Sequence, residues 1–247
     1  MSLVLSNLCK KYENNGRTTL NGINLTIEDG ELICVVGQSG CGKSTLLNLI
    51  AGLEMPTAGE VLLDGEPVTA PGADRTVMFQ DHGLYPWLNV IDNVSAGMKF
   101  AGIPKKEREE KALFYLGLMH LTEYRDYAIH QLSGGMRQRV ALARALTMDS
   151  RILLMDEPFS ALDKQTSNGL REELQRIWME TGRTIFFITH SVEEAVYLAD
   201  RVVVMHPHEG KISRIYCIAL ERPRHVYTEE FVELRRKILE DVRGETV

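Results

Sequence analysis

Apolar and polar residues follow two different periods along this chain, and together they predict a mixed α/β fold. Short continuous apolar runs predict buried strands at 32–36, 152–155, 184–189, 202–205 and 212–217. Helical spacing of apolar residues predicts helices at 164–180 and 191–199, and a closing helix with Phe231, Leu234, Ile238 and Val242 on one face. Strands that alternate with helices in this way are typical of an α/β core whose sheet is covered on both faces.

Two stretches depart from the alternation. Residues 3–12 and 22–27 read as short strands that should pair as an antiparallel element beside the core. Further strands are predicted at 60–63 and 76–79, with Asp64-Gly65 as a hairpin turn between them. From about 88 to 148 the pattern is mostly helical, with candidate helices at 89–101, 104–116 and 134–148. We therefore divide the chain into a core (1–87 and 149–220), an inserted helical subdomain (about 88–148) and a tail (221–247).

Composition and charge narrow the classes of function. The 247 residues are 44% hydrophobic and 25% charged, which is ordinary for a globular protein, and the formal net charge is −6. This acidic balance gives no support for nucleic-acid binding. No apolar run approaches the roughly 18 residues that span a bilayer, and the first residues lack the pattern of a signal peptide. The four cysteines lack metal-site spacing, so we expect small buried thiols in a reducing compartment.

The most specific chemical pattern lies directly after the predicted strand at 32–36. It reads G-x-x-x-x-G-K-[ST] and consists of Gly37, Gln38, Ser39, Gly40, Cys41, Gly42, Lys43, Ser44 and Thr45. Its glycines let backbone N–H groups surround phosphate oxygens, and the helix that follows adds the positive end of its dipole. Lys43 should reach the β- and γ-phosphates, and Ser44 should bind Mg²⁺. We predict that this loop binds a nucleoside triphosphate and that a bulky adduct on Cys41 would block it.

A pair of carboxylates ends the predicted strand at 152–155. Asp156 is suited to hold Mg²⁺, usually through water, and Glu157 is placed one residue further to act on an attacking water. A strand end followed by two acids and Pro158 is also compatible with a simple polar turn. The phosphate loop earlier in the chain favours the catalytic interpretation.

A second anion site is predicted at residues 131–140. Ser133 is suited to cap a helix, and Gly134-Gly135 expose backbone N–H groups at its start. One chain would then carry two helix starts that attract phosphate. We therefore expect the open side of the triphosphate to be covered by a partner molecule.

The segment L-S-G-G-M-R-Q-R within this stretch resembles the signature motif of ATP-binding cassette (ABC) proteins. The resemblance covers about residues 3–215. It implies a P-loop NTPase (RecA-like) core, an N-terminal antiparallel β element, an inserted α-helical subdomain, and Mg²⁺-dependent ATP hydrolysis. It also assigns roles along the chain: adenine stacking to Tyr12, Mg²⁺ binding and γ-phosphate sensing to Gln80, the D-loop to residues 160–163, and γ-phosphate contact to His190.

The same resemblance implies a head-to-tail dimer of two copies of the chain. Each Mg–ATP would lie between one copy and the Ser133 and Gly135 N–H donors of the other. The first copy would supply the loop residues together with the metal ligands Ser44, Gln80 and Asp156 and the catalytic residues Glu157, His190 and Gln80.

A narrower resemblance follows Gln80. Residues 81–88 contain Leu84-Tyr85-Pro86-Trp87-Leu88, which is similar to the L-x-P-W-L segment of ATPase subunits of nitrate, sulfonate and taurine importers. It implies a transmembrane permease, an extracytoplasmic solute-binding protein and a place on the cytoplasmic face of the membrane. Trp87 is expected to contact the permease, with burial in the core as the alternative. An exporter subunit, a non-transport ABC ATPase and a small-molecule P-loop kinase remain as alternatives, and the sequence does not name the solute.

Overall fold

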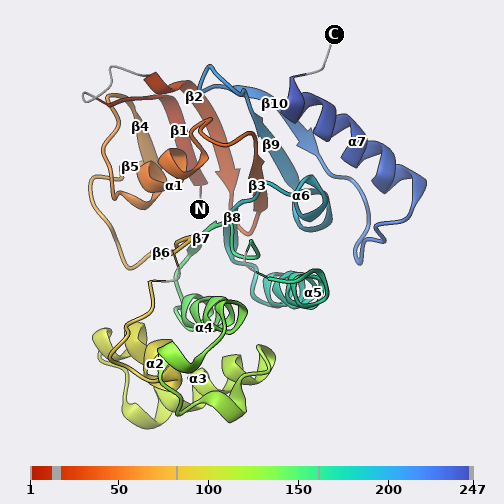
Figure 1. Ribbon diagram of the computed structural model, residues 1–247. Coiled ribbons are helices and arrows are strands. Elements are labelled where there is room, and N and C mark those ends of the chain that lie inside the picture. The colour runs from red at the N-terminus through yellow and green to blue at the C-terminus, as the bar shows by residue number, and fades with distance from the viewer. Residues whose placement is uncertain (1, 13–17, 82, 161, 245–247) are drawn as a thin grey trace.

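The computed structural model describes residues 2–12, 18–81, 83–160 and 162–244. Figure 1 shows two sheets in the upper part of the molecule and a group of helices below them. Among the described residues, no helix is both long and apolar enough to cross a membrane.

The larger sheet has six strands in the order β10-β9-β3-β8-β7-β6. These are β3 (Leu32–Val36), β6 (Arg75–Met78), β7 (Ile152–Asp156), β8 (Thr184–Ile188), β9 (Arg201–Met205) and β10 (Ile212–Cys217). All pairs are parallel except the β10–β9 pair at one edge. Every residue of β3, β7 and β8 is buried, which explains their continuous apolar sequences.

The smaller sheet is antiparallel, with the order β2-β1-β4-β5. Its strands are β1 (Ser2–Lys11), β2 (Thr18–Glu28), β4 (Ala58–Leu63) and β5 (Glu66–Pro67). The predicted N-terminal antiparallel element is thus present. The predicted pairing across Asp64-Gly65 is wrong, because this turn joins β4 to the two-residue strand β5. The chain then leaves the small sheet, and β6 pairs in parallel with β7.

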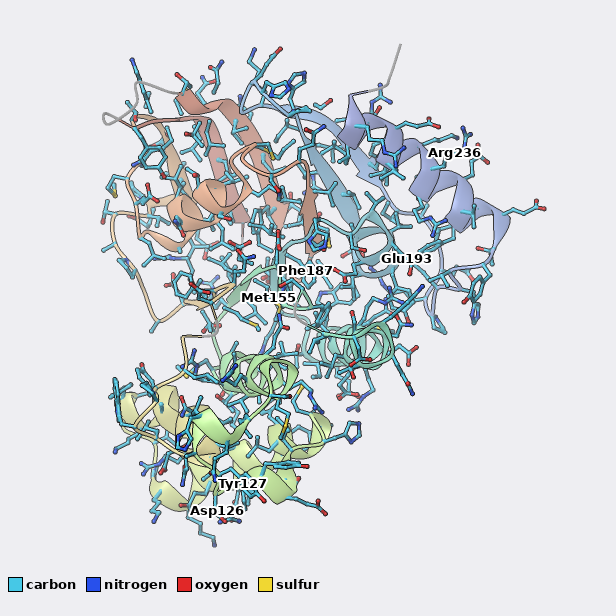
Figure 2. The ribbon with its side chains drawn as sticks, viewed as in Figure 1. Asp126, Tyr127, Met155, Phe187, Glu193 and Arg236 are labelled. Atoms are coloured by element: carbon cyan, nitrogen blue, oxygen red, sulfur yellow. The ribbon has the colours of Figure 1, made fainter. Side chains whose placement is uncertain are left out.

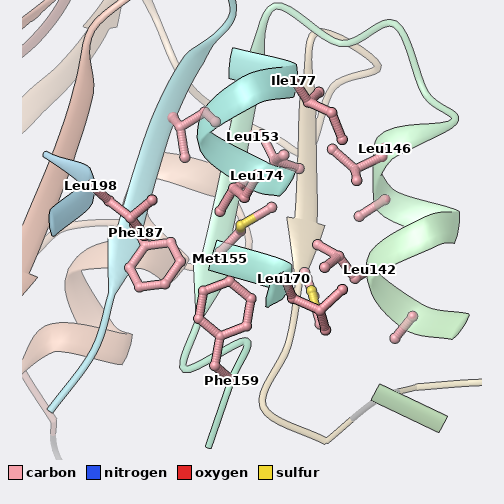
Figure 3. Close-up of a cluster of buried hydrophobic side chains, with 14 of the residues drawn as sticks. Leu142, Leu146, Leu153, Met155, Phe159, Leu170, Leu174, Ile177, Phe187 and Leu198 are labelled. Atoms are coloured by element: carbon pink, nitrogen blue, oxygen red, sulfur yellow. The ribbon is translucent and has the colours of Figure 1, made fainter. Parts of the chain in front are cut away.

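Alternate residues of the six-stranded sheet face two different apolar cores. Ile33, Val35 and their neighbours on β7, β8 and β9 pack against the small sheet and α1 (Lys43–Ala51). The alternate residues face the core formed with the remaining helices, including α5 (Lys164–Thr181) and α6 (Val192–Leu198). Figure 3 shows part of this second core, where Met155 and Phe187 of the strands lie among leucines of the surrounding helices. The six-stranded sheet is therefore covered on both faces.

Three helices lie between β6 and β7 in the sequence, within the stretch expected to be helical. They are α2 (Val90–Phe100), α3 (Lys105–Leu118) and α4 (Gly134–Leu146), with two short 3-10 turns at Thr122–Tyr124 and Ile129–Gln131. Asn89 and Ser133 cap α2 and α4 by accepting backbone N–H groups. The three helices pack on one another below the sheets (Figure 1), and the labelled Tyr127 lies at their lower end (Figure 2).

The tail forms α7 (Glu229–Arg243), which packs on α6 and on the β9–β10 edge of the sheet. Phe231 and Ile238 are buried beneath it, as the helical spacing predicted. Arg235 pairs with Glu193 of α6 at 2.8 Å, and Asp241 accepts a hydrogen bond from Tyr216 of β10. Helix α7 is therefore docked on the core along its length.

Candidate functional site

The glycine-rich loop connects β3 to α1, as its sequence predicts. Gly40 and Gly42 adopt left-handed backbone conformations, with φ values of 78° and 107°. A Cβ atom on Gly42 would lie 2.7 Å from Leu20 Cδ2 and 2.9 Å from the Thr19 carbonyl oxygen. Both the backbone conformation and the close approach of Thr19 therefore require glycine here, and the α1 N-terminus opens directly onto the loop.

Lys43 is folded into the loop and is only 7% exposed. Its ammonium group donates hydrogen bonds to the carbonyl oxygens of Gly37 at 2.8 Å and Gln38 at 3.0 Å. The cation is thus held by two carbonyl groups at the start of the loop. Phosphate oxygens bound by the loop would be alternative acceptors for the same ammonium group.

Asp156 ends β7 beside the loop and is 8% exposed. Burial raises the pKa of its carboxyl group, Ser44 opposes this by hydrogen bonding to the carboxylate, and the nearby Glu157 charge adds to the increase. Ser44 and Asp156, predicted as metal ligands from distant parts of the sequence, are therefore in contact. Figure 2 shows Met155 and Phe187 near the centre of the molecule, where β7 and β8 run side by side.

Glu157 has a left-handed backbone conformation, with φ of 49°, which is unusual for a residue other than glycine. Its N–H group donates to the carbonyl oxygen of Ile188 at 2.9 Å, and this bond fixes the turn. Its carboxylate lies 3.4 Å from Gln80 Nε2 and 3.4 Å from His190 Nδ1. The three predicted catalytic residues therefore meet, although they are far apart in the sequence.

Parallel pairing explains this meeting. Gln80, Glu157 and His190 follow the adjacent strands β6, β7 and β8, and the carboxyl ends of parallel strands lie at one edge of a sheet. A pocket of about 410 Å³ lies at this edge, lined by Thr19, Ser39, Gly40, Gly42, Lys43, Ser44, Thr45, Gln80, Glu157 and His190. A larger cavity of about 690 Å³, between α5 and residues 223–227, contains none of the predicted site residues. We place the site at the smaller pocket because the charged and glycine-rich groups converge there.

Two residues that the sequence reasoning did not assign also belong to the site. Gln138 of α4 is buried and donates from Nε2 to the carbonyl oxygen of Glu157 at 3.3 Å. It links the helix that follows Ser133 to the catalytic turn. Its place within the L-S-G-G-M-R-Q-R motif was the available signal. Thr19 lines the pocket, and no local pattern marks it.

Ser133 and Gly135 lie at the start of α4, and they do not line the 410 Å³ pocket of the described chain. Ser133 is exposed and its hydroxyl accepts a hydrogen bond from the N–H group of Met136 at 3.2 Å. Figure 1 places α4 below the sheet and away from α1. This helix start is therefore accessible to another molecule.

Tyr12 lies at the end of β1, beside the helix of the phosphate loop. Its hydroxyl donates to Glu54 Oε2 at 2.7 Å and lies 3.4 Å from Thr45 Oγ1. The hydroxyl end of Tyr12 is thus beside the first turn of α1, and stacking of its ring on adenine stays a prediction.

Cys41 is one of the four cysteines expected to be buried thiols, and it lies inside the phosphate loop. It is buried, and burial raises the pKa of its thiol although Lys43 acts in the opposite direction. The small buried side chain fills space between the loop and the core, so access of reagents is poor.

Trp87 is 76% exposed, which excludes the alternative that it is a core residue. Its loop is held from below by Asn93, a fully buried residue of α2. Asn93 accepts the N–H group of Tyr85 at 2.7 Å and donates to carbonyl oxygens of Tyr85, Leu88 and Asn89. This fixed loop presents the indole ring to solvent, with the Tyr85 ring 5.5 Å away.

The parallel sheet, the glycine-rich loop and the carboxylates at the strand ends define a P-loop nucleotide hydrolase. Comparison with known proteins gives the family. Residues 20–160 match the ABC transporter family. Over 249 residues the chain is 51% identical to an uncharacterized ABC transporter ATP-binding protein of Methanocaldococcus jannaschii, covering 100% of this chain and 93% of that protein.

Two further similarities agree with this family assignment. The taurine import ATP-binding protein TauB of Burkholderia thailandensis is 44% identical over 238 residues, which cover 93% of this chain and 91% of TauB. The dimeric structure of MJ0796, described as a bacterial ABC transporter cassette, superposes with a TM-score of 0.81 at 31% identity and covers 89% of this chain and 100% of MJ0796. The chain therefore belongs to the ABC transporter family and is an ATP-binding subunit with ATPase activity.

Proposed function

We propose that this chain is the ATPase that powers solute import through a membrane permease, and that the 410 Å³ pocket is its Mg–ATP site. The observation that supports the site most strongly is the meeting of Gln80, Glu157 and His190 beside the glycine-rich loop. Loop N–H groups would hold the phosphates, and Lys43 would exchange its bonds to the loop carbonyls for bonds to phosphate oxygens. The Tyr12 ring would stack on adenine.

Ser44, Asp156 and Gln80 fit a Mg²⁺ ion that accompanies the nucleotide. They offer hydroxyl, carboxylate and amide oxygens, which are the donors that Mg²⁺ prefers. Burial raises the pKa of Asp156, so a bound cation beside it would stabilise its ionised form. A bound Mg²⁺ would supply positive charge beside the β- and γ-phosphates during phosphoryl transfer.

The catalytic turn is suited to act on water. The Glu157 carboxylate would polarise a water molecule for in-line attack on the γ-phosphate. Gln80 and His190, both 3.4 Å from this carboxylate, would fix the positions of the water and the γ-phosphate. The unusual backbone of Glu157 supports this role, since strained conformations cluster at functional sites.

We further propose that two copies form a head-to-tail dimer, with Ser133 and Gly135 of each copy completing the other's ATP site. The exposed start of α4 and the dimeric form of MJ0796 support this arrangement. The core (1–87 and 149–220), the helical subdomain (88–148) and the tail (221–247) are part of the same proposal. Closure on ATP and opening after hydrolysis would be the motion transmitted to the permease.

The taurine importer relatives support import of a small solute, with taurine, a sulfonate or nitrate as candidates. The exposed Trp87 would contact a permease, because an apolar ring on a fixed loop can bury a large area against a partner. The chain would then lie on the cytoplasmic face of the membrane and act indirectly with an extracytoplasmic solute-binding protein. We propose no nucleic-acid partner. An exporter subunit or a non-transport ABC ATPase is the alternative function.

Replacement of Glu157 tests the catalytic proposal. Glu157→Gln should bind Mg–ATP but not hydrolyse it, because only the group that polarises water is lost. The trapped ATP should hold two subunits together as a dimer in size-exclusion chromatography. A Glu157→Gln protein that binds ATP and stays monomeric would contradict the dimeric site.

Mixed dimers test whether the site is shared. Ser133→Arg should remove hydrolysis while sparing nucleotide binding to the isolated subunit, whereas Lys43→Ala should weaken binding itself. A mixed dimer of the two variants contains one doubly damaged site and one intact site. Such mixtures should recover ATPase activity, and no recovery at any mixing ratio would count against sharing, provided that one site can hydrolyse alone.

A further inference from the structure

The carboxylate of Glu54 contacts hydrogen-bond donors from separate parts of the chain. Its Oε2 accepts the Tyr12 hydroxyl at 2.7 Å and lies 3.2 Å from Lys10 Nζ, and its Oε1 accepts Asn48 Nδ2 at 3.0 Å. Burial alone would raise the pKa of Glu54, but the hydrogen bonds from Tyr12, Asn48 and Lys10 outweigh it and lower the pKa. Glu54 is therefore an ionised acceptor at neutral pH.

The backbone of Glu54 is also fixed, and it is fixed to the helix of the phosphate loop. The N–H groups of Leu53 and Glu54 both donate to the Asn48 carbonyl oxygen, at 2.9 and 3.3 Å. Asn48 lies in α1, so its backbone and its side chain both hold Glu54. The carboxylate is consequently a rigid extension of α1.

The Tyr12 ring is held at two points. Its hydroxyl proton is used in the bond to Glu54, so Thr45 is the donor in the 3.4 Å contact between the two hydroxyl groups. The Lys10 ammonium lies 5.1 Å from the ring centroid, a cation–π contact, and also donates to the Met55 carbonyl oxygen at 2.8 Å. Both hydroxyl partners belong to α1 or follow it directly, and Thr45 adjoins Ser44.

We propose that Glu54 is a positioning residue for nucleotide-base recognition: it holds the Tyr12 ring at a fixed place relative to α1 and thereby relative to the phosphate loop. The inference rests on the proposed function, in which Tyr12 stacks on adenine. A base and a triphosphate are joined through one ribose, so their two binding surfaces must keep a fixed separation. The Tyr12–Glu54–Asn48 chain of hydrogen bonds sets this separation, and the base stacks on the face of the ring opposite Lys10.

Loss of this chain of hydrogen bonds should weaken the binding only of ligands that carry a base. A ring that is free to change rotamer must be ordered when ATP binds, and ordering one side chain weakens binding by about two- to ten-fold. Glu54→Ala should therefore weaken Mg–ATP binding by that factor. It should leave inorganic tripolyphosphate binding within about two-fold of wild type, since this probe contacts the loop and lacks a base.

Four comparisons test the assignment by isothermal titration calorimetry of the purified chain with Mg–ATP and with Mg–tripolyphosphate. Tyr12→Phe, which keeps the ring but loses the hydroxyl, should match Glu54→Ala. The double variant should be no weaker than either single variant, because both remove one link. Glu54→Gln should restore the wild-type ratio, since its amide oxygen can accept from Tyr12 while its NH₂ group donates to a reoriented Asn48 amide. Glu60→Ala, which removes an exposed carboxylate from neighbouring β4, is the control for net charge and should bind as wild type does.

The outcomes separate the possibilities. Equal weakening of ATP and tripolyphosphate by Glu54→Ala would overturn the proposal, because Glu54 would then only support α1. An unchanged affinity for both ligands would overturn it as well. If wild type binds ATP no more tightly than tripolyphosphate, Tyr12 is not a base platform and the inference falls with it. That result would leave the proposed role of Glu157 in ATP hydrolysis untouched, because the Glu157→Gln variant tests that role separately.

Discussion

Arg224 offers the sharpest test of how the tail is attached to the core. Its guanidinium group is buried, with the residue 4% exposed, and it donates to five backbone carbonyl oxygens. Three acceptors lie at the end of α6, on Val196, Tyr197 and Ala199, at 2.7, 3.0 and 2.7 Å. The cation thus caps the negative end of α6, the helix that follows His190.

The stability lost on replacing Arg224 follows from the carbonyl acceptors that would lose their donor. Burial lowers the pKa of Arg224 to about 10, with the Arg222 charge contributing, so the side chain remains charged at pH 7. Each buried carbonyl left unsatisfied costs about 1–3 kcal/mol, but some regain partners through water, and recovered guanidinium hydration offsets part of the loss. We expect Arg224→Met, which keeps the length and apolar stem, to reduce the free energy of unfolding by about 3–5 kcal/mol.

Urea unfolding followed by circular dichroism measures this loss. Arg224→Lys should lie between Met and wild type, because an ammonium keeps the charge but offers three donors instead of five. Arg236→Met is the control, since Arg236 is an exposed arginine of α7 paired with Glu240 and points away from the core (Figure 2). If Arg224→Met unfolds within about 1 kcal/mol of wild type at an unchanged m-value, the five bonds contribute little net stability and the reasoning is refuted.

Three other predictions follow from burial and charge. Trp87→Ala should leave the melting temperature and basal ATPase of the isolated subunit near wild type but reduce co-purification with a permease; a large drop in melting temperature would contradict its exposed position. The pKa of Asp156 is higher in the native state than its unfolded value near 3.8. Between these two pKa values the native state binds more protons than the unfolded state, so the free energy of unfolding falls as pH rises through this interval. Asp156→Asn should therefore raise the nucleotide-free melting temperature at pH 7, by an amount that shrinks as pH falls toward 3.8, and a lower melting temperature at pH 7 would contradict this sign. Ellman's reagent should react fastest with exposed Cys217 and slowly with buried Cys41, and a fast phase that survives Cys217→Ser but disappears in Cys41→Ser would reverse the order.

Local sequence determined the elements and the phosphate loop. Apolar runs located β3, β7 and β8 because strands buried on both faces need continuous apolar residues. The loop was predictable as well, since residues 37–45 are contiguous and their glycines specify the backbone directly. The Ser133 cap followed from a local rule as well, and its side chain accepts a backbone N–H group at the start of α4.

Family resemblance, rather than any local rule, assigned Gln80, Glu157 and His190 to one site. Their actual meeting depends on the strand order β6-β7-β8, because long-range pairing brings the three strand ends to one edge. The Asp64-Gly65 turn shows the limit of local rules. Its turn signal was correct, but the strand predicted as the hairpin partner, β6, pairs with β7 of the larger sheet, and β5 pairs with β4 instead.

Burial was likewise decided by the tertiary structure. An isolated tryptophan in a sequence does not reveal whether it is covered, and Trp87 is exposed because Asn93, six residues later, holds the loop backbone from beneath. Cys41 lies in a ligand-binding loop yet is buried, because the loop packs it against the core. Glu54 carries no motif, and its contacts with Tyr12 and Lys10 exist only because β1 runs beside α1. Each of these outcomes depends on how other elements pack around the residue, and the type of the residue and its immediate neighbours do not specify that packing.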